Sequence, residues 1–171
     1  MKKYYTQIYY VIVDKFDLRI LDLLKDNADL SLSEIGRKVG IFSPSAISKR
    51  IRDLKKEGYI KKSVALLDYE KLGYDFLTVT FIKTRYEKNY AQTIGEKLKQ
   101  LPNVIGIYFI LGDIDFIMLT VNHNRKQYLA TMEKLTAMEE IERSDSRVVA
   151  YTVKDIDFSS INLLDSDADK Q

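Results

Sequence analysis

Two helix starts lie close together in this sequence, with a glycine between them. Ser31 and Glu34 have the spacing of a capping box, in which a hydroxyl and a carboxylate satisfy free backbone N–H groups. Ser43-Pro44 begins the next helix, because serine caps well and proline costs nothing at the first helical position. Gly40 lies between them, where a left-handed backbone is cheap only for glycine. The chain must therefore join two short helices by a tight turn.

A further helix precedes this pair, with Asp14 as its expected cap and Asn27 as its stop. Gly36 lies midway along the second helix, where a close-packed partner helix would leave no room for a large side chain. Gly58 closes the third helix. Three short helices over residues 14–58 predict a helix-turn-helix domain. The apolar residues at helical spacing, expected to form its core, are Phe16, Ile20, Leu23, Leu24, Leu32, Ile35, Val39, Ile47, Ile51 and Leu54.

From Tyr59 onward the pattern is that of strands alternating with helices. After residue 74 the order is βαββαβ, which predicts a ferredoxin-like domain over 74–154 and an α+β chain overall. Gly112-Asp113-Ile114 suits a tight hairpin turn. The expected strands are Ile60–Leu67, Phe76–Thr84, Val104–Leu111, Asp115–Val121 and Val148–Val153, and the expected helices are Asn89–Gln100, with Ile94, Leu98 and Leu101 inward, and Arg125–Met138, with Tyr128, Leu129, Met132 and Leu135 inward.

Three further segments complete the predicted organisation. Residues 1–13 form an N-terminal extension, whose Tyr4, Tyr5, Tyr9 and Tyr10 either pack on a partner or lie upstream of the true start. Residues 59–73 form a linker of one strand and a turn. Residues 155–171 carry five aspartates with little periodicity, so we expect an acidic, flexible tail.

Charge divides the chain into a basic part and an acidic part. Residues 1–62 carry 14 Lys/Arg against 8 Asp/Glu, and residues 63–171 carry 13 against 17. The segment Ser43–Lys62 alone has 7 against 2. This asymmetry indicates one module that meets a polyanion and one that does not, although solvated helix faces carry similar runs.

Other features narrow the class of protein. The sequence has no cysteine, which removes disulfides, thiolate metal sites and thiol catalysis, and no His/Cys cluster supports a metal site. No apolar run is long enough to span a membrane. The segment Met1–Gln7 lacks the aliphatic core and cleavage site of a signal peptide. We expect a cytoplasmic protein without a cofactor.

The third helix presents a polar row once its apolar residues are buried. Ser45, Ser48, Lys49 and Arg52 then face outward and fit the DNA major groove, where Arg52 can contact a guanine edge bidentately. The helix start at Ser43 and Ser45 can hold a phosphate. One such helix reads few base pairs, so a dimer on a near-palindromic, double-stranded operator is expected. The cations better placed to meet the DNA backbone, or simply to be solvated, are Arg50, Lys55, Lys56, Lys61 and Lys62.

The order and spacing of these motifs resemble the Lrp/AsnC (feast/famine) family of transcription regulators over roughly residues 14–154. The Lys/Ile/Tyr-rich composition suggests an archaeal member. The turn Gly40–Ser43 is one residue longer than the family's usual turn, and Ser144-Asp145-Ser146 replaces its Thr-x-Thr. The matching motifs are Asp14-x-x-Asp17-x-x-Ile20-Leu21, Ser31-x-x-Glu34-Ile35, Val39-Gly40, Arg50-Ile51-x-x-Leu54, Glu57-Gly58-x-Ile60, Leu67-Asp68, Leu72-Gly73, Gly112-Asp113-Ile114-Asp115 and Arg143-Ser144-Asp145-Ser146.

The resemblance implies an effector-binding second domain, known in the family as the RAM domain. It implies homodimers, further assembly into octamers, and an amino acid or related metabolite bound between dimers. The strand Ile60–Leu67 would link the domains of one dimer. An amino acid needs carboxylate partners for its ammonium and donors for its carboxylate. The alternative for Gly112-Asp113 is a purely structural hairpin turn. The effector residues carried over are Tyr108, Gly112, Asp113, Ile114, Asp115, Ser144, Asp145 and Ser146.

Two other functions remain open at this stage. Siroheme decarboxylases resemble the same two-domain architecture, so the fold alone does not exclude an enzyme. The single histidine, His123, lies at a strand-to-helix junction with no partner visible in the sequence, and we expect no enzyme. A non-specific architectural DNA-binding protein would have nearly the same sequence, and only a specificity ratio separates it from a regulator.

Overall fold

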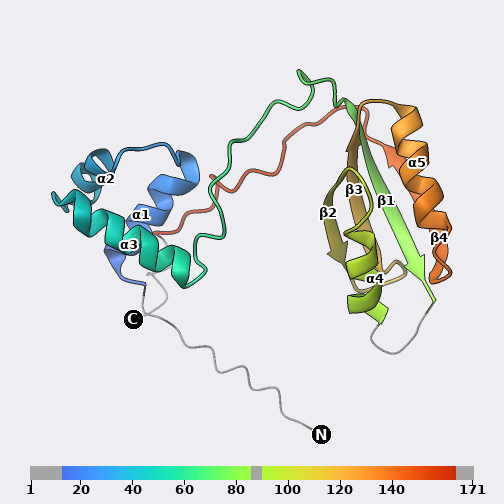
Figure 1. The fold of residues 1–171 in the computed structure, drawn as a ribbon, viewed down its shortest axis with the longest axis horizontal. Helices are drawn as coiled ribbons and strands as arrows, with labels where there is room; N and C mark the ends of the chain where they lie inside the picture. Colours follow the sequence, from blue (N-terminus) through green and yellow to red (C-terminus); the bar gives the residue numbers. More distant parts are fainter. Residues whose placement is uncertain (1–12, 86–89, 165–171) are drawn as a thin grey trace, which may run out of the picture. The chain divides into compact units, whose positions relative to one another are not determined.

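The computed structural model describes residues 13–85 and 90–164. The chain forms two compact units. Among the described residues, the helical unit contains 13–66 together with 154–164, and the sheet unit contains 67–85 and 90–153 (Figure 1). Within the described ranges, no helix is both long and apolar enough to cross a membrane.

The helical unit is built from α1 (Lys15–Asp26), α2 (Leu32–Val39) and α3 (Pro44–Lys56), and all three predicted caps are confirmed. The Asp14 carboxylate accepts from the backbone N–H of Phe16 and Asp17 at the start of α1. The Ser31–Glu34 capping box is complete. The core cluster of this unit contains Ile20, Ile35, Val39, Ile47 and Leu54, packed against partly buried neighbours that include Leu23, Leu24 and Ile51.

The turn between α2 and α3 depends on two glycines. Gly40 has a φ of +83°, as its predicted role as a left-handed cap requires. A Cβ on Gly36 would lie 2.3 Å from the backbone carbonyl oxygen of Ile41. The predicted crowding at Gly36 is therefore present, but the turn itself supplies it rather than a partner helix.

Two predictions for the ends of this unit need correction. Leu32 is 37% exposed at the first position of α2, so it lies outside the core. Residues 61–67 form no strand; Val64 and Leu66 are exposed, and no described strand lies beside them to supply backbone hydrogen bonds. The described part of the acidic tail belongs to the helical unit, where the Lys25 Nζ donates to the Ile161 carbonyl oxygen at 2.5 Å.

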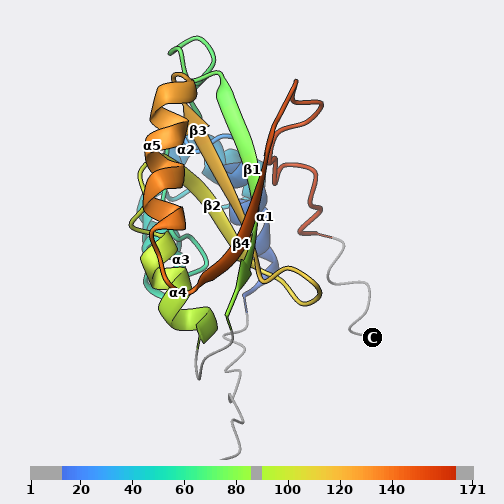
Figure 2. The same cartoon turned by 90° about the vertical axis from the view of Figure 1, so that its right-hand side faces the viewer.

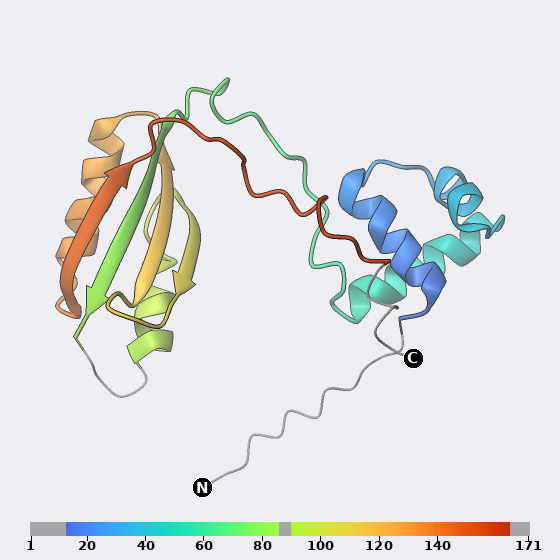
Figure 3. The same cartoon turned by 180° about the vertical axis from the view of Figure 1, so that it is seen from behind.

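The sheet unit has the predicted βαββαβ order. Its elements are β1 (Phe76–Thr84), α4 (Tyr90–Leu98), β2 (Val104–Phe109), β3 (Phe116–Asn122), α5 (Arg125–Thr136) and β4 (Ile141–Val148). The strand order is β2-β3-β1-β4, with every neighbouring pair antiparallel, which is the ferredoxin-like arrangement. Figure 3 shows β1 (green) between β4 (red-orange) and β3 (gold).

Both helices pack on one face of this sheet, as Figure 2 shows. Ile82 of β1, Phe116 and Met118 of β3, and Leu98 of α4 lie in the core between the two layers. The opposite face, which we call the open face, carries the alternate residues of each strand. Its central residues on β1 and β3 are apolar and only partly buried: Leu77, Val79, Phe81, Ile117, Leu119 and Val121.

The last strand starts earlier than predicted. It covers Ile141–Val148, whereas the sequence predicted Val148–Val153. The apolar run after Val148 cannot continue the ladder for long, because its neighbour β1 begins at Phe76 and Val148 already pairs with Thr78. In α5 the predicted inward residue Leu129 is exposed, and Thr131 occupies the buried face beside Leu135.

Candidate functional site

The outward face of α3 carries the predicted DNA-binding residues. Ser43 caps the helix and its hydroxyl lies 2.9 Å from that of Ser45. Ser48 is half-buried. The remaining members of the row are solvent-exposed: Ser45, Lys49, Arg52, Lys55 and Lys56, with Lys61 and Lys62 beyond the helix end. The row lies opposite the buried residues Ile47 and Leu54, as the spacing predicts.

An acidic residue interrupts the basic surface. Asp53 accepts from the Lys49 Nζ at 2.9 Å, and both side chains are largely exposed. This hydrogen bond from Lys49 is the largest cause of the lowered pKa of Asp53. Burial opposes the shift, and the charges of Lys49, Lys56 and Arg52 lower the pKa further. Asp53 is therefore ionised at neutral pH and offsets part of the positive charge of α3.

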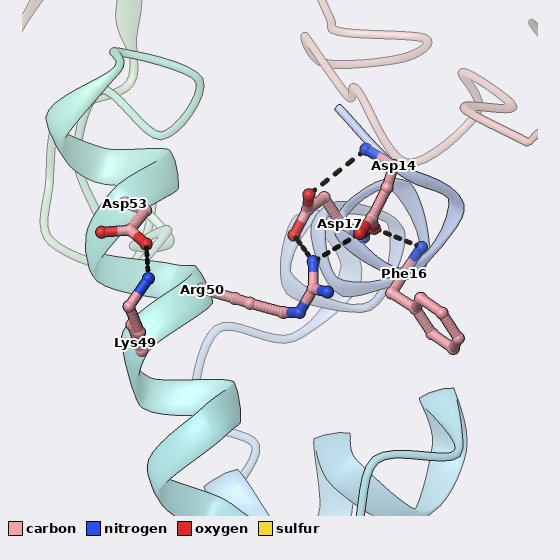
Figure 4. A network of polar contacts seen from close by, with 6 residues as sticks. All are labelled: Asp14, Phe16, Asp17, Lys49, Arg50 and Asp53. Atoms are coloured by element: carbon pink, nitrogen blue, oxygen red, sulfur yellow. Dashed lines mark hydrogen bonds and ion pairs between the residues drawn. The ribbon is translucent and has the colours of Figure 1, made fainter. Parts of the chain in front are cut away.

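Arg50 differs from the other cations of α3. Its Nη1 donates to Asp14 at 2.8 Å and to Asp17 at 2.7 Å, so its guanidinium joins α3 to the start of α1 (Figure 4). The hydrogen bond to Asp17 is the largest cause of the raised pKa of Arg50. This geometry gives Arg50 a role in positioning α3, and it does not support the predicted contact with the DNA backbone.

The Asp14 carboxylate therefore has two structural roles. One oxygen caps α1, and the other accepts from Arg50. Burial opposes the ionisation of Asp14, but the backbone N–H of Asp17 and the hydrogen bond and charge of Arg50 outweigh it, so the pKa of Asp14 lies below its ordinary value.

Phe42 was not among the predicted site residues. It lies in the turn directly before the cap of α3, and it is 82% exposed. The lengthened turn was visible in the sequence, but nothing in the periodicity showed that its aromatic side chain would point into solvent beside the polar row.

In the sheet unit, the predicted effector residues of the hairpin between β2 and β3 lie in two different environments, some exposed and one buried. Gly112 and Asp113 are exposed at its tip, and Ile114 is partly exposed. Asp115 is only 3% exposed; its carboxylate accepts from the backbone N–H of Thr84 at 2.7 Å and from the Thr84 hydroxyl at 3.0 Å. Asp115 thus anchors the hairpin to the end of β1.

The residues of the stretch Ser144-Asp145-Ser146 also face different sides of the sheet, because the stretch lies inside β4 rather than before the last strand. Ser144 pairs with Ile82 and Ser146 with Thr80, so both face the helix layer. The Ser146 hydroxyl lies 2.9 Å from that of Thr80 and donates to the Met132 sulfur at 3.4 Å. Asp145 points to the open face, and Tyr108 on β2 points to that face too.

A hollow of about 490 Å³ lies on the open face. It brings together two of the predicted effector residues with four that the sequence reasoning missed. Strand alternation could have found Phe81 and Lys83, which share a face of the predicted strand Phe76–Thr84. It could not have found Arg143 and Arg147, because they precede the last strand as it was predicted. Its lining residues are Phe81, Lys83, Ile114, Arg143, Asp145 and Arg147.

His123 has a structural role. Its Nδ1 lies 2.7 Å from the Gly73 carbonyl oxygen, and its ring stacks on Tyr74 with the ring centres 3.6 Å apart. These contacts fasten the segment before β1 to the loop after β3. Across residues 13–85 and 90–164, no group of three or more His, Cys, Asp or Glu side chains is placed to hold a metal ion.

Comparisons with known proteins agree with this architecture. Residues 13–61 match the family model for winged helix-turn-helix DNA-binding, and residues 78–157 match that for the Lrp/AsnC ligand binding domain. The HTH-type transcriptional regulator Zrp of Zymomonas mobilis is 32% identical over 118 residues, which cover 68% of this chain and 76% of that protein. The HTH-type transcriptional regulator FL11 of Pyrococcus horikoshii is 28% identical over 145 residues, covering 85% of this chain and 94% of FL11.

Solved structures show the same fold. A transcriptional regulator of Neisseria meningitidis in complex with L-Met superposes with a TM-score of 0.76 at 21% identity, covering 85% of this chain and 94% of that one. The relatives are named as transcriptional regulators, so neither an enzyme nor a non-specific architectural protein is favoured. The chain belongs to the Lrp/AsnC family of DNA-binding transcription regulators.

Proposed function

We propose that this chain is a sequence-specific transcription regulator that reads the major groove with α3 and responds to an amino acid or an analogue bound by its sheet unit. One observation carries the DNA-binding half of the proposal. The face of α3 opposite the core consists of hydroxyl and cationic side chains, and α3 follows a tight turn after α2, as a recognition helix does.

Within this surface we separate base contacts from phosphate contacts. Ser45, Lys49 and Arg52 lie along the exposed face and are assigned to base edges, with Ser48 at the edge of that face. The start of α3 at Ser43 is assigned to a phosphate, because its backbone N–H groups and the helix dipole favour an anion. Lys55 and Lys56, in the last turn of the helix, are assigned to the backbone phosphates.

Phe42 joins this proposed surface. Residues at the start of a recognition helix approach base edges, and an aromatic ring there can contact the methyl group of thymine. Replacing single operator thymines by uracil removes only that methyl group. We expect one such replacement to weaken binding by the native protein and to leave a Phe42→Ala variant unaffected; equal effects on both proteins would exclude the contact.

The open face of the sheet supports a homodimer. Val79 lies beside Leu119 and Leu77 beside Val121, which gives a continuous apolar surface that a second copy would cover. A symmetric dimer would bring two α3 helices to a near-palindromic operator, and dimers would assemble further into octamers.

The effector half of the proposal rests on the ligand-binding domain match and on the L-Met bound by the Neisseria meningitidis regulator. The candidate site comprises the hairpin tip and the open-face residues of β4, with Asp145 as a partner for an ammonium group. A regulator of this kind works in the cytoplasm with the DNA, and the similarity to FL11 is compatible with an archaeal source.

Fluorescence anisotropy tests the proposed DNA binding. The native protein would be titrated onto DNA from its own upstream region and onto scrambled DNA of equal length, across a series of salt concentrations. We expect a steep loss of affinity with salt and a cognate preference of about 10³-fold or more. Equal affinity for both DNAs would point to an architectural protein, and no binding to either would contradict the proposal.

A further inference from the structure

The chain returns to the helical unit after the sheet unit is complete. The described helical unit comprises residues 13–66 and 154–164, so the sheet unit is joined to it covalently at both ends. We call residues 154–164 the return segment, and Figures 1 and 3 show it (red) reaching α1. The described core cluster of this unit is built from residues between Ile20 and Ile60. The return segment is therefore held by other contacts.

One lysine of α1 makes the contact with the return segment. Lys25, in the last turn of the helix, donates from Nζ to the Ile161 carbonyl oxygen at 2.5 Å and lies 2.8 Å from the Asp22 carboxylate. Its side chain is only 17% exposed, although lysine side chains mostly extend into water. The position of this side chain is therefore fixed by its contacts.

The contact lies on the side of α1 that points away from the core. Leu18, Asp22 and Lys25 are spaced by four and three residues, so they share one side of the helix. The buried Ile20 lies on the opposite side. Leu18, Asp22 and Lys25 are all only partly exposed, so the outer side of α1 is partly covered as well.

A local turn presents the Ile161 carbonyl group to Lys25. The Ile161 N–H donates to the Phe158 carbonyl oxygen at 3.1 Å. The Asp157 carboxylate accepts from the backbone N–H and from the hydroxyl of Ser159, both at 2.9 Å. Asp157 therefore shapes the turn whose end meets α1.

The attachment of the return segment is polar rather than apolar. Ile156, Phe158 and Ile161 remain between 51% and 66% exposed, so these side chains bury little apolar area. The hydrogen bond from the charged Lys25 then provides a large part of the attachment. A segment that is held in this way opens locally at a low cost in free energy.

We propose that residues 154–164 act as a releasable strap, which fastens the end of the chain to the last turn of α1 and stiffens the domain that holds α3. The ion pairs of Arg50 with Asp14 and Asp17 join the start of α1 to α3. Lys25 is fastened at the other end of the same helix. The strap is thus connected to α3 through α1, and its release weakens the support of α3.

Hydrogen exchange of peptides from the full-length protein tests the strap from its α1 side. Lys25→Met keeps an apolar stem of similar length but removes the donor to Ile161. We expect exchange in the last turn of α1 and in residues 154–164 to become about 10-fold faster, the loss expected for one hydrogen bond from a charged group. Lys38→Met, which changes an exposed lysine in the last turn of α2, should leave both segments unchanged.

The strap can also be loosened from its own side. Asp157→Ala removes the acceptor that shapes the turn and should accelerate exchange in the last turn of α1 by a similar factor. Asp155→Ala makes the same change of charge where the carboxylate accepts from the adjacent N–H of Ile156, and should leave α1 unchanged. Circular dichroism melting curves would show that all the variants are folded. Unchanged exchange in α1 for either Lys25→Met or Asp157→Ala, or equal effects of Asp155→Ala and Asp157→Ala, would overturn the strap.

Introduced thiols report whether the strap and α1 belong to the same copy, because the chain has no cysteine of its own. A Lys25→Cys, Ile161→Cys variant would be treated with a short bismaleimide at low protein concentration, and the linked peptides identified by mass spectrometry. We expect a link within one chain. A covalent dimer in place of that link would assign the return segment to a second copy and overturn the proposal.

DNA binding shows whether the strap supports α3. Lys25→Met and Asp157→Ala should each weaken binding by about 3-fold or more, by similar factors on cognate and scrambled DNA, because no base contact is removed. The two substitutions change the net charge in opposite directions, so a common loss of affinity cannot come from long-range electrostatics. Tighter binding by Asp157→Ala together with weaker binding by Lys25→Met would instead be an effect of charge alone, and would refute the support of α3 by the strap.

Discussion

The helical unit and the sheet unit present their candidate sites in different ways. On α3, residues that share an outward face recur every three or four positions, so the site follows one stripe of a single helix. On β4, neighbouring residues point to opposite faces, and Ser144-Asp145-Ser146 is divided between the helix layer and the open face. Consecutive residues on a strand therefore do not form a single surface.

The largest effect on stability is expected in the helical unit, at the turn between α2 and α3. Gly36→Ala would put a Cβ 2.3 Å from the Ile41 carbonyl oxygen, which the turn can relieve only by moving. We expect a loss of about 3 kcal/mol or more in the free energy of unfolding, at the upper end for overpacking, and loss of DNA binding. Gly40→Ala, at φ +83° with no close neighbour, should cost less, about 1–2 kcal/mol for the left-handed backbone alone. Chemical denaturation followed by circular dichroism measures both, and equal costs would contradict the crowding.

In the sheet unit the two aspartates of the hairpin should behave differently. Asp115→Ala leaves the buried N–H and hydroxyl of Thr84 without their acceptor, and should cost about 1–3 kcal/mol of stability. Asp113→Ala changes an exposed tip residue and should have little effect. Hydrogen exchange of peptides from β1 and β3 measures the difference. If the Asp115→Ala protein were instead stable but altered in its effector response, Asp115 would be an effector-binding residue, as the sequence predicted.

The division of α3 into base and phosphate contacts predicts two kinds of loss. Arg52→Ala should weaken cognate binding by about 1–3 kcal/mol and relax the sequence preference. Lys56→Ala should weaken cognate and random DNA by similar factors and make binding less sensitive to salt. Anisotropy titrations on both DNAs distinguish these patterns. If the two variants lose affinity equally on cognate and random DNA, Arg52 does not read bases.

The smallest expected effect concerns the acid side of the stability profile. Burial opposes the ionisation, but the backbone N–H of Asp17 and then the ion pair with Arg50 lower the pKa of Asp14, so its ionised carboxylate stabilises the fold above the unfolded pKa of about 3.9. This contribution is lost as the pH falls through the lower pKa of the folded state. Asp14→Asn keeps a good helix cap but removes the charge, so its deficit should be present at pH 7 and shrink below about pH 4. Asp14→Ala, which also removes the cap, should retain a deficit at low pH in the same denaturation experiment.

Much of the fold follows from local sequence rules. The three helix caps and the left-handed Gly40 depend on neighbouring residues, and these predictions are confirmed. The register of β4 was wrong because pairing depends on the length of β1, which is distant in sequence. The ion pairs of Arg50 with Asp14 and Asp17 were invisible for the same reason, since they join residues on different helices.

The Arg50 cluster also bears on how a regulator of this kind can change its operator. Arg50 is committed to the joint between α1 and α3, whereas Ser45 and Arg52 face solvent and hold no part of the core. If α3 reads DNA as proposed, substitutions at Ser45 and Arg52 would alter the preferred DNA sequence without disturbing the framework of the domain. Substitution of Asp14 or Asp17, by contrast, would disturb the ion pairs that hold α3 against the start of α1.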